Sequence, residues 1–224
     1  MIDAVLCELE GVVVETAVPR RRAMMHTFAE AGLDMSGIDA TSRLPVRDAV
    51  MAALAEATGS SDATLVDLLA AKASRHFLAE VATGLSLAPG ALEVLSALQA
   101  RARLALVTRA ERDATDRILS MAGLDGLFEV IVTAADVIEG KPNPEGHRAA
   151  LSRLTNRRPV TTPLAIEDRL SGVRAARAAG ISCVMVGPSP AHEALEANAL
   201  IDSLAGHTLD SLGALIARGG ARVA

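Results

Sequence analysis

Short apolar runs alternate with longer segments of helical periodicity over most of this chain. The apolar runs, each of a length typical of a buried strand, cover residues 4–7, 104–107, 130–132, 164–166 and 182–186. Amphipathic segments predicted as helices follow at residues 91–100, 111–122, 145–154 and 170–179. Alternating strands and helices are typical of a parallel sheet joined by right-handed crossovers. We therefore predict an α/β fold with a doubly wound, Rossmann-like parallel sheet.

One long stretch, residues 17–85, lacks this alternation. It contains no convincing strand pattern and three helix-like segments at residues 19–31, 46–58 and 62–81. A helical insertion between the first strand and the next strand–helix unit predicts a separate cap subdomain. We expect a core of residues 1–16 and 86–224 and a cap of residues 17–85, with hinges near 16–18 and 83–89.

Composition argues against a nucleic-acid-binding protein and against a membrane-spanning protein. The chain has 224 residues, enough for one large or two modest domains, and half of them are hydrophobic. With no Trp or Tyr, three Phe and a net charge of −5 from interspersed charges, it lacks the footprint of a nucleic-acid-binding protein. No apolar run approaches the ~18 residues of a membrane span, and no signal-peptide pattern begins the chain. We expect a cytoplasmic globular protein; its oligomeric state is not predicted.

Cysteine and histidine do not form recognisable metal or disulfide patterns. Cys7 and Cys183 both fall in apolar strand-like runs, where Cys is usually a small buried hydrophobe. The five histidines show no metal-ligand spacing and are predicted to be surface or packed helix residues: His26, His76, His147, His192 and His207.

Polar groups of one coherent chemistry follow the first four predicted strands. They are Glu8 and Glu10 after the first, Thr108 after the second, Lys141 after the third, and Glu167 and Asp168 after the fourth. Because parallel strands bring their carboxyl ends to one edge, we expect these groups to share a crevice. Several carboxylates favour Mg²⁺, and a hydroxyl and an ammonium beside it suit a phosphoryl group. A carboxylate can also act as a nucleophile, with a second acid moving the proton.

Lys141 is prominent on composition alone. Of the 22 lysines and arginines, only Lys72 and Lys141 are lysines. One of the two falls in the loop Gly-Lys-Pro-Asn-Pro-Glu, where phosphate binding calls for a compact point charge. This favours a functional role for Lys141 over that of a solvated loop lysine.

The motifs resemble those of the haloacid dehalogenase-like (HAD) phosphatases. Residues 8–16, Glu-Leu-Glu-Gly-Val-Val-Val-Glu-Thr, match the first motif of that family, Asp-x-Asp-Gly-x-x-x-Asp-Ser/Thr, with Glu at all three Asp positions. Gly-Lys-Pro-Asn-Pro-Glu and Glu-Asp-Arg-Leu-Ser-Gly-Val look like the later motifs of its helical-cap subgroup. That subgroup includes β-phosphoglucomutase and phosphoglycolate phosphatase, and the resemblance covers nearly the whole chain.

The resemblance implies a role for each motif residue. Glu8 takes the nucleophile position and also binds the metal, and Glu10 takes the general acid/base position and binds the metal through its backbone carbonyl. Thr108 and Lys141 hold the phosphoryl group. The Mg²⁺ site is completed by Glu167 and Asp168.

Three arginines, Arg20, Arg47 and Arg109, are candidates for the expected substrate site, and Arg169 is a further departure from the family motif. Arg109 stands where the family usually has Asn, and Arg169 where it usually has Ser. Both additions favour an anionic substrate. Arg20, at the start of the first cap helix, and Arg47, at a cap position that contacts substrate in mutase-like members, are further candidates for substrate binding.

The expected function is a Mg²⁺-dependent phosphatase acting on a small phosphorylated metabolite, with a phosphosugar mutase as a variant. Glu in place of Asp leaves three interpretations: a site rebuilt around Glu, a site that binds metal and phosphate with little turnover, or a vestigial site on a scaffold. A non-catalytic binding protein is therefore the alternative. A dehalogenase is disfavoured by Glu10, and a phosphonate hydrolase by the absence of an early cap lysine.

Overall fold

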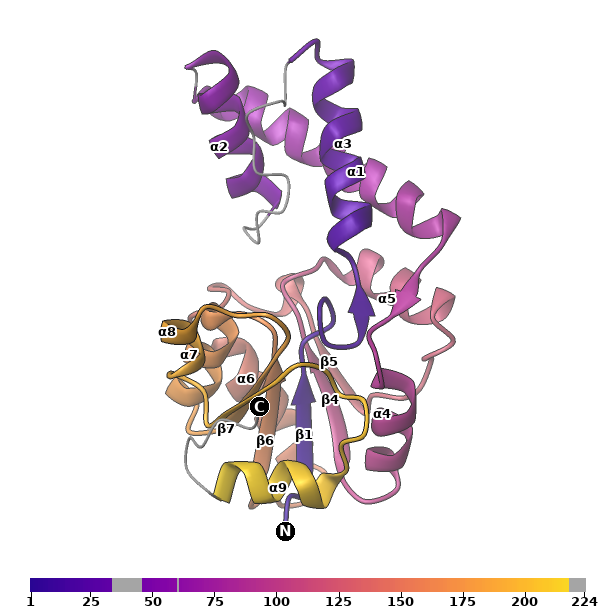
Figure 1. Ribbon diagram of the computed structural model, residues 1–224, viewed down its shortest axis with the longest axis vertical. Helices are drawn as coiled ribbons and strands as arrows, with labels where there is room; N and C mark the ends of the chain where they lie inside the picture. The colour runs from indigo at the N-terminus through magenta and orange to yellow at the C-terminus, as the bar shows by residue number, and fades with distance from the viewer. Residues whose placement is uncertain (34–45, 60, 218–224) are drawn as a thin grey trace. The chain divides into compact units, whose positions relative to one another are not determined.

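A six-stranded parallel sheet forms the centre of the larger part of the molecule (Figure 1). The computed structural model describes residues 1–33, 46–59 and 61–217. The strands of the sheet are β1 (Ala4–Cys7), β4 (Arg103–Val107), β5 (Val130–Val132), β6 (Pro163–Glu167), β7 (Ser182–Val186) and β8 (Ala199–Ile201). All adjacent pairs are parallel. The predicted α/β fold with a parallel sheet is confirmed.

Helices flank this sheet. They are α4 (Ala91–Gln99), α5 (Arg112–Met121), α6 (Glu145–Thr155), α7 (Leu170–Ala178), the short α8 (Ala191–Ala194), α9 (Leu209–Ala217) and the 3-10 turn η1 (Ala134–Asp136). The sequence pattern predicted α4 to α7 within one or two residues of these ends. It did not predict η1, α8, β8 or α9.

The strand order places β1 at the centre of the site-bearing edge. The order is β5-β4-β1-β6-β7-β8, so the chain runs outward from β1 through β4 to β5 and then returns to the other side of β1 at β6. Cys7 pairs with Leu106 of β4 on one side and Ile166 of β6 on the other. The carboxyl end of β1 is therefore the switch point of the sheet, where open α/β folds bind ligands.

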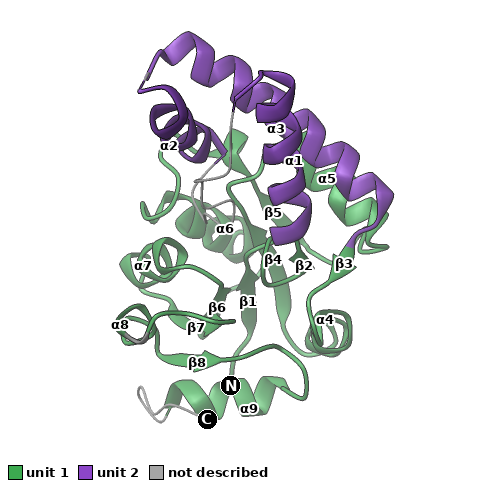
Figure 2. Ribbon diagram, turned by 45° about the horizontal axis from the view of Figure 1, so that its top comes forward, with its two compact units in different colours: residues 1–15, 86–224 green, residues 16–85 purple. Residues whose placement is uncertain are grey.

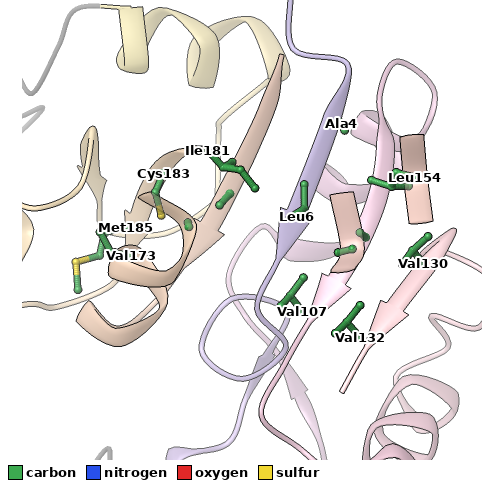
Figure 3. Packing of buried hydrophobic residues seen from close by; sticks show 14 of the residues in the cluster. Ala4, Leu6, Val107, Val130, Val132, Leu154, Val173, Ile181, Cys183 and Met185 are labelled. Carbon is green, nitrogen blue, oxygen red and sulfur yellow. The ribbon is translucent and has the colours of Figure 1, made fainter. Parts of the chain in front are cut away.

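Alternate residues of the strands build one hydrophobic core against α6 and α7. Leu6, Val107 and Met185 belong to this cluster with Leu154 of α6 and Val173 of α7 (Figure 3). Side chains at every second strand position point to the same face, so the intervening residues, such as fully buried Cys7, face the other side. A sheet buried on both faces explains the almost purely aliphatic strands.

A short antiparallel pair lies beside the main sheet. β2 (Val14–Glu15) pairs with β3 (Ser86–Leu87), so the chain leaves and re-enters the sheet-bearing part at neighbouring points. Before β2 the chain makes a tight turn in which the Val14 N–H donates to the Leu9 carbonyl and the Gly11 N–H donates to the Val14 carbonyl. Gly11 has φ +82°, a conformation that favours glycine.

The chain divides into two compact units, residues 1–15 with 86–224 and residues 16–85 (Figure 2). The second unit, here called the cap unit, holds α1 (Ala17–Glu30), α2 (Val46–Thr58) and α3 (Ala63–Thr83). It has its own small core, which includes Phe28 and Leu54. None of the described helices is long and apolar enough to cross a lipid bilayer.

Candidate active site

Glu8 is the first residue beyond β1 and is held at both ends. Its backbone N–H donates to the Ile166 carbonyl at 3.0 Å, which continues the ladder with β6. Its Oε1 accepts a hydrogen bond from the N–H of the next residue, Leu9, at 2.8 Å. Its Oε2 lies 2.6 Å from Lys141 Nζ. Only 7% of Glu8 is exposed, so this carboxylate is fixed in a largely water-excluded position.

Lys141 joins three strand ends through one ammonium group. Its Nζ donates to Glu8 Oε2 at 2.6 Å, to Glu167 Oε1 at 2.6 Å and to the Val107 carbonyl at 2.8 Å. An ammonium has three N–H donors, so all three are used. Burial disfavours the charged form, but Glu167 and Glu8 outweigh it and raise the pKa of Lys141 above its ordinary value. Lys141 is therefore a permanent cation between two carboxylates.

Glu167, at the end of β6, has a second neighbour that sequence reasoning did not assign to the site. His147 Nε2 of α6 lies 3.0 Å from Glu167 Oε1. His147 is fully buried, and neither ring nitrogen has a hydrogen-bond partner in the described part of the chain, so this is a close contact without hydrogen-bond geometry. Burial favours the neutral acid, but Lys141 and His147 outweigh it and lower the pKa of Glu167.

Two glycines make room for the acids that follow β6. A Cβ placed on Gly172, in the first turn of α7, would lie 1.8 Å from Glu167 Oε2. A Cβ placed on Gly11 would lie 2.5 Å from Asp168 Oδ2. Both distances are far below any real contact, so the carboxylates occupy the volume that a side chain would take. Glycine is therefore required at position 172 to accommodate Glu167 and at position 11 to accommodate Asp168.

Thr108 and Arg109 follow β4 on the other side of β1. The Thr108 N–H donates to the Val132 carbonyl at 2.9 Å, which extends the pairing with β5. Its side chain is buried, and Oγ1 accepts from the Ala110 N–H at 3.2 Å. Arg109 is partly buried and lines a pocket together with Thr108 and Lys141.

Glu10 and Asp168 complete the predicted group of acids. Glu10 lies in the turn after β1 and is 7% exposed, and Asp168 follows Glu167 and is 5% exposed. Arg169 Nε lies 3.4 Å from Asp168 Oδ2, the longest of the contacts in this site. Arg169 therefore faces an acid of the site.

The two thiols near the sheet do not compete as nucleophiles. Cys7 and Cys183 are free and fully buried in β1 and β7, as the sequence predicted. Burial, with Glu167 next in importance, raises the pKa of both thiols. Neither forms a thiolate near neutral pH, and the thiolate is the reactive form.

The donor set fits Mg²⁺ in its chemistry. Glu8, Glu10, Glu167 and Asp168 supply buried hard oxygen donors at one sheet edge, the ligand type that Mg²⁺ prefers. In this structure the Lys141 ammonium lies between two of these carboxylates, Glu8 and Glu167. Among the residues that the structure describes, no three His, Cys, Asp or Glu side chains are gathered as a metal-binding group. The Mg²⁺ site therefore stays a prediction.

The two arginines predicted to bind substrate from the cap lie in the other unit. Arg20 of α1 stacks its guanidinium 4.8 Å from the ring centroid of Phe77. Arg47 of α2 pairs with Asp67 of α3, with 2.7 Å between Arg47 Nε and Asp67 Oδ1. The first contact joins α1 to α3 and the second joins α2 to α3. The predicted roles of both arginines in substrate binding stay predictions.

Similarity to known proteins covers almost the entire chain. Validoxylamine A 7'-phosphate phosphatase of Streptomyces hygroscopicus subsp. limoneus is 32% identical over 208 residues, which cover 91% of this chain and 95% of the relative. The crystal structure of CbbY from Rhodobacter sphaeroides in complex with phosphate matches with a TM-score of 0.79 and 28% identity over 95% of this chain and 100% of CbbY.

A second crystal structure of a CbbY variant from Rhodobacter sphaeroides, in complex with xylulose-(1,5)bisphosphate, matches with a TM-score of 0.75, 28% identity, and coverage of 95% of this chain and 99% of that one. The family profile described as haloacid dehalogenase-like hydrolase matches residues 5–186, a span that begins in β1 and ends in β7. Those residues carry every motif at the switch point of the sheet, and they make this chain a member of the haloacid dehalogenase-like hydrolase family.

Proposed function

We propose that this protein is a Mg²⁺-dependent phosphatase that hydrolyses a small phosphorylated metabolite with Glu8 as nucleophile. The observation that carries the proposal is the 2.6 Å contact between Glu8 Oε2 and Lys141 Nζ at the switch point, with Thr108 after the neighbouring strand. A nucleophilic carboxylate beside an ammonium and a hydroxyl suits attack on a phosphoryl group. The relatives support the substrate class, since one is named for a phosphate ester and another is seen with phosphate and a sugar bisphosphate.

In the proposed reaction a Glu8 oxygen attacks phosphorus and the ester bond to the leaving alcohol breaks. Glu10 gives a proton to the alcohol, which departs, and the phosphoryl group remains on Glu8 as an acyl phosphate. Glu10 then takes a proton from a water that attacks phosphorus, which releases inorganic phosphate and restores Glu8. The two steps share one acid/base group, because the proton that Glu10 gives to the leaving alcohol is replaced by a proton from the attacking water.

Lys141 and Thr108 would hold the phosphoryl oxygens during both steps. The Lys141 ammonium already lies within hydrogen-bond distance of Glu8, so it is positioned to stabilise negative charge that develops beside that carboxylate. For Mg²⁺ we propose the side chains of Glu8, Glu167 and Asp168 and the Glu10 carbonyl as ligands. When bound, the metal supplies positive charge that offsets the negative charge of the phosphoryl group. Arg20 and Arg47 are proposed to contact the rest of the substrate.

A specific observation also supports the alternative, a protein that binds metal or phosphate without efficient turnover. All three N–H donors of Lys141 are used by Glu8, Glu167 and the Val107 carbonyl. A phosphoryl group must replace at least one of these acceptors before Lys141 can bind it. If that exchange is costly, the site binds weakly and turns over slowly.

Release of inorganic phosphate from a panel of sugar and acid phosphates tests the proposal. We expect turnover in the presence of Mg²⁺, loss of turnover with a chelator, and no activity in Glu8→Gln, which keeps the shape of the side chain and removes the nucleophile. Wild-type turnover equal to that of Glu8→Gln on every ester would exclude the phosphatase and leave the binding protein.

A further inference from the structure

A pocket of about 250 Å³ opens beside the proposed phosphoryl site. Thr108 and Lys141 line the part of the pocket next to the proposed phosphoryl site, and the rest is lined by residues from the segments that follow β4 and β5. The lining residues that the structure describes all belong to the larger unit. The volume is about eight times the ~30 Å³ share of one liquid water, which is room for a short chain ending in one polar group.

The floor of this pocket is apolar. Val107, Val132 and Val137 line it, and so does Gly146 at the start of α6. A Cβ placed on Gly146 would lie 3.2 Å from Val107 Cγ1 and 3.8 Å from Cγ1 of Val132 and of Val137. These valines therefore pack closely against the Gly146 backbone, and a methyl group at this position would crowd Val107. Such a floor favours a carbon chain over a bare hydrated ion.

Among the residues that the structure describes, Arg109 is a cation on the wall of the pocket without a partner. Lys141 uses its three donors on other residues, and the Glu139 carboxylate is bound by the Asn143 side chain. Arg109 is partly buried and forms no hydrogen bond or ion pair with any residue in the described ranges. Its Cδ lies 4.0 Å from the position a Cβ would take on Gly140, so its stem runs along the same wall.

We propose that this pocket binds a second anionic group of the substrate, joined to the phosphoryl group by a short aliphatic spacer. The inference rests on the proposed function and specifies its substrate class as acidic phosphorylated metabolites. The phosphoryl group binds at Thr108 and Lys141, the spacer lies over Val107 and Val132, and the second anion binds the guanidinium of Arg109. A guanidinium binds a carboxylate or phosphate through two parallel hydrogen bonds, and unpaired cations in partly buried sites are unusual unless a ligand completes them.

Binding of matched phosphonates by calorimetry tests this without requiring turnover. The probes are 3-phosphonopropionate against propylphosphonate and 4-phosphonobutyrate against butylphosphonate, in buffer containing Mg²⁺. Each pair differs in a carboxylate against a methyl group. We expect wild type to prefer the carboxylate at one or both chain lengths, and Arg109→Gln to weaken that ligand about 10- to 100-fold. The alkylphosphonates should change less than about threefold.

Two further variants sharpen the test. Arg101→Gln removes the same charge at the opposite end of β4, where Arg101 pairs with Asp210, and should leave the preference unchanged. Gly146→Ala adds a methyl group to the pocket floor and should weaken both members of each pair while leaving inorganic phosphate unaffected.

The outcomes separate this inference from the proposed function. Equal binding of carboxylate and alkyl ligands by wild type at both lengths overturns the pocket, even if phosphate esters are hydrolysed. A preference that depends on Arg109, in a protein without phosphatase activity, supports the pocket and overturns the catalytic proposal. Failure of all four phosphonates to bind overturns the pocket, whatever the turnover of phosphate esters.

Discussion

The Glu8 carboxylate turns back toward the backbone of the next residue, with Oε1 2.8 Å from the Leu9 nitrogen. Glu has one more methylene group than Asp, which lengthens the side chain by roughly one C–C bond of ~1.5 Å. The bend toward Leu9 takes up part of that length and still leaves Oε2 at 2.6 Å from Lys141 Nζ. The turn therefore accommodates Glu at this position, which favours a site rebuilt around it.

Shortening Glu8 should accordingly lower activity. In Glu8→Asp the carboxylate retreats from Lys141, and we expect kcat/KM on an aryl phosphate to fall by about 10²-fold, because displacements near 1 Å have effects of that size. Phosphate release at saturating Mg²⁺ measures it. A rise in turnover would instead identify Glu8 as an overlong nucleophile. Adding Glu10→Asp should give a double variant less impaired than the two single effects combined, since nucleophile and acid act together.

Asp168→Ala should weaken Mg²⁺ binding. Asp168 is 5% exposed and lies against Gly11 beside the other acids, so its loss removes one hard oxygen ligand from the proposed site. Calorimetric titration with Mg²⁺ measures the affinity. Asp202→Asn, a charge change at an exposed position after β8, is the control and should bind as wild type does. Equal affinity in Asp168→Ala and Asp202→Asn would rule out Asp168 as a ligand.

Gly172→Ala should destabilise the protein and reduce turnover together. The new methyl group would overlap Glu167 Oε2, and the carboxylate cannot move without disturbing Lys141. We expect a loss of about 1–3 kcal/mol in the free energy of unfolding, typical of overpacking. Gly213→Ala in α9 is the matched control, since its methyl group would lie 3.6 Å from Ile2 Cδ1, an ordinary contact. That control should gain about 0.5–1 kcal/mol from helix propensity; urea unfolding separates the two variants.

The Asp136 carboxylate should make stability depend on acid pH. Burial favours its neutral form, but hydrogen bonds from the Thr133 N–H and from Arg153 and the Thr133 hydroxyl outweigh it and lower its pKa below 3.8. A lowered pKa means that ionised Asp136 stabilises the fold above the unfolded-state value of 3.8, and that this contribution is lost as the pH falls through the folded-state value.

Asp136→Asn should therefore lower the free energy of unfolding at pH 7 by about 1–3 kcal/mol, the range for hydrogen bonds to charged groups. The difference from wild type should shrink when urea unfolding is repeated below pH 3.8. Asp202→Asn serves again as the exposed control. A difference that stays constant with pH would show that the charge of Asp136 does not stabilise the fold.

The sequence predicted the central sheet well because its strands are unbroken apolar runs with clear helical segments between them. The prediction gave β1, β5 and β7 with the bounds that the structure has. It omitted β8 and α9. Residues 199–201, Ala-Leu-Ile, begin with two helix-forming residues and lack the fully β-branched run of β5, and residues 209–217 have only two polar side chains, so they show no polar face. The pair of β2 and β3 was missed for a different reason: each has two residues, and their pairing depends on a contact across the whole inserted segment.

The sequence was sufficient to predict which residues lie at the site. It was not sufficient to predict the contacts among their side chains. Strand order brings Glu8, Thr108 and Glu167 together, since β4 and β6 both flank β1. The contact of His147 with Glu167 depends on the rotation of α6, which places residue 147 on the buried face of that helix. Its sequence signal was weak: a lone histidine on an amphipathic helix two residues after the Lys-Pro-Asn-Pro-Glu loop. The bend of Glu8 is likewise a property of side-chain packing.

The central position of β1 has a consequence for how the chain is made. β1 leaves the ribosome before both of its neighbours in the sheet, which are β4, beginning at Arg103, and β6, beginning at Pro163. At about 5–20 residues per second, the interval between synthesis of β1 and of β6 is roughly 8–30 s. During this interval the edge of β1 that pairs with β6 in the native sheet has no partner. Translation that stalls before β6 would leave nascent chains with one edge of this apolar strand unpaired, and such chains would depend on chaperones.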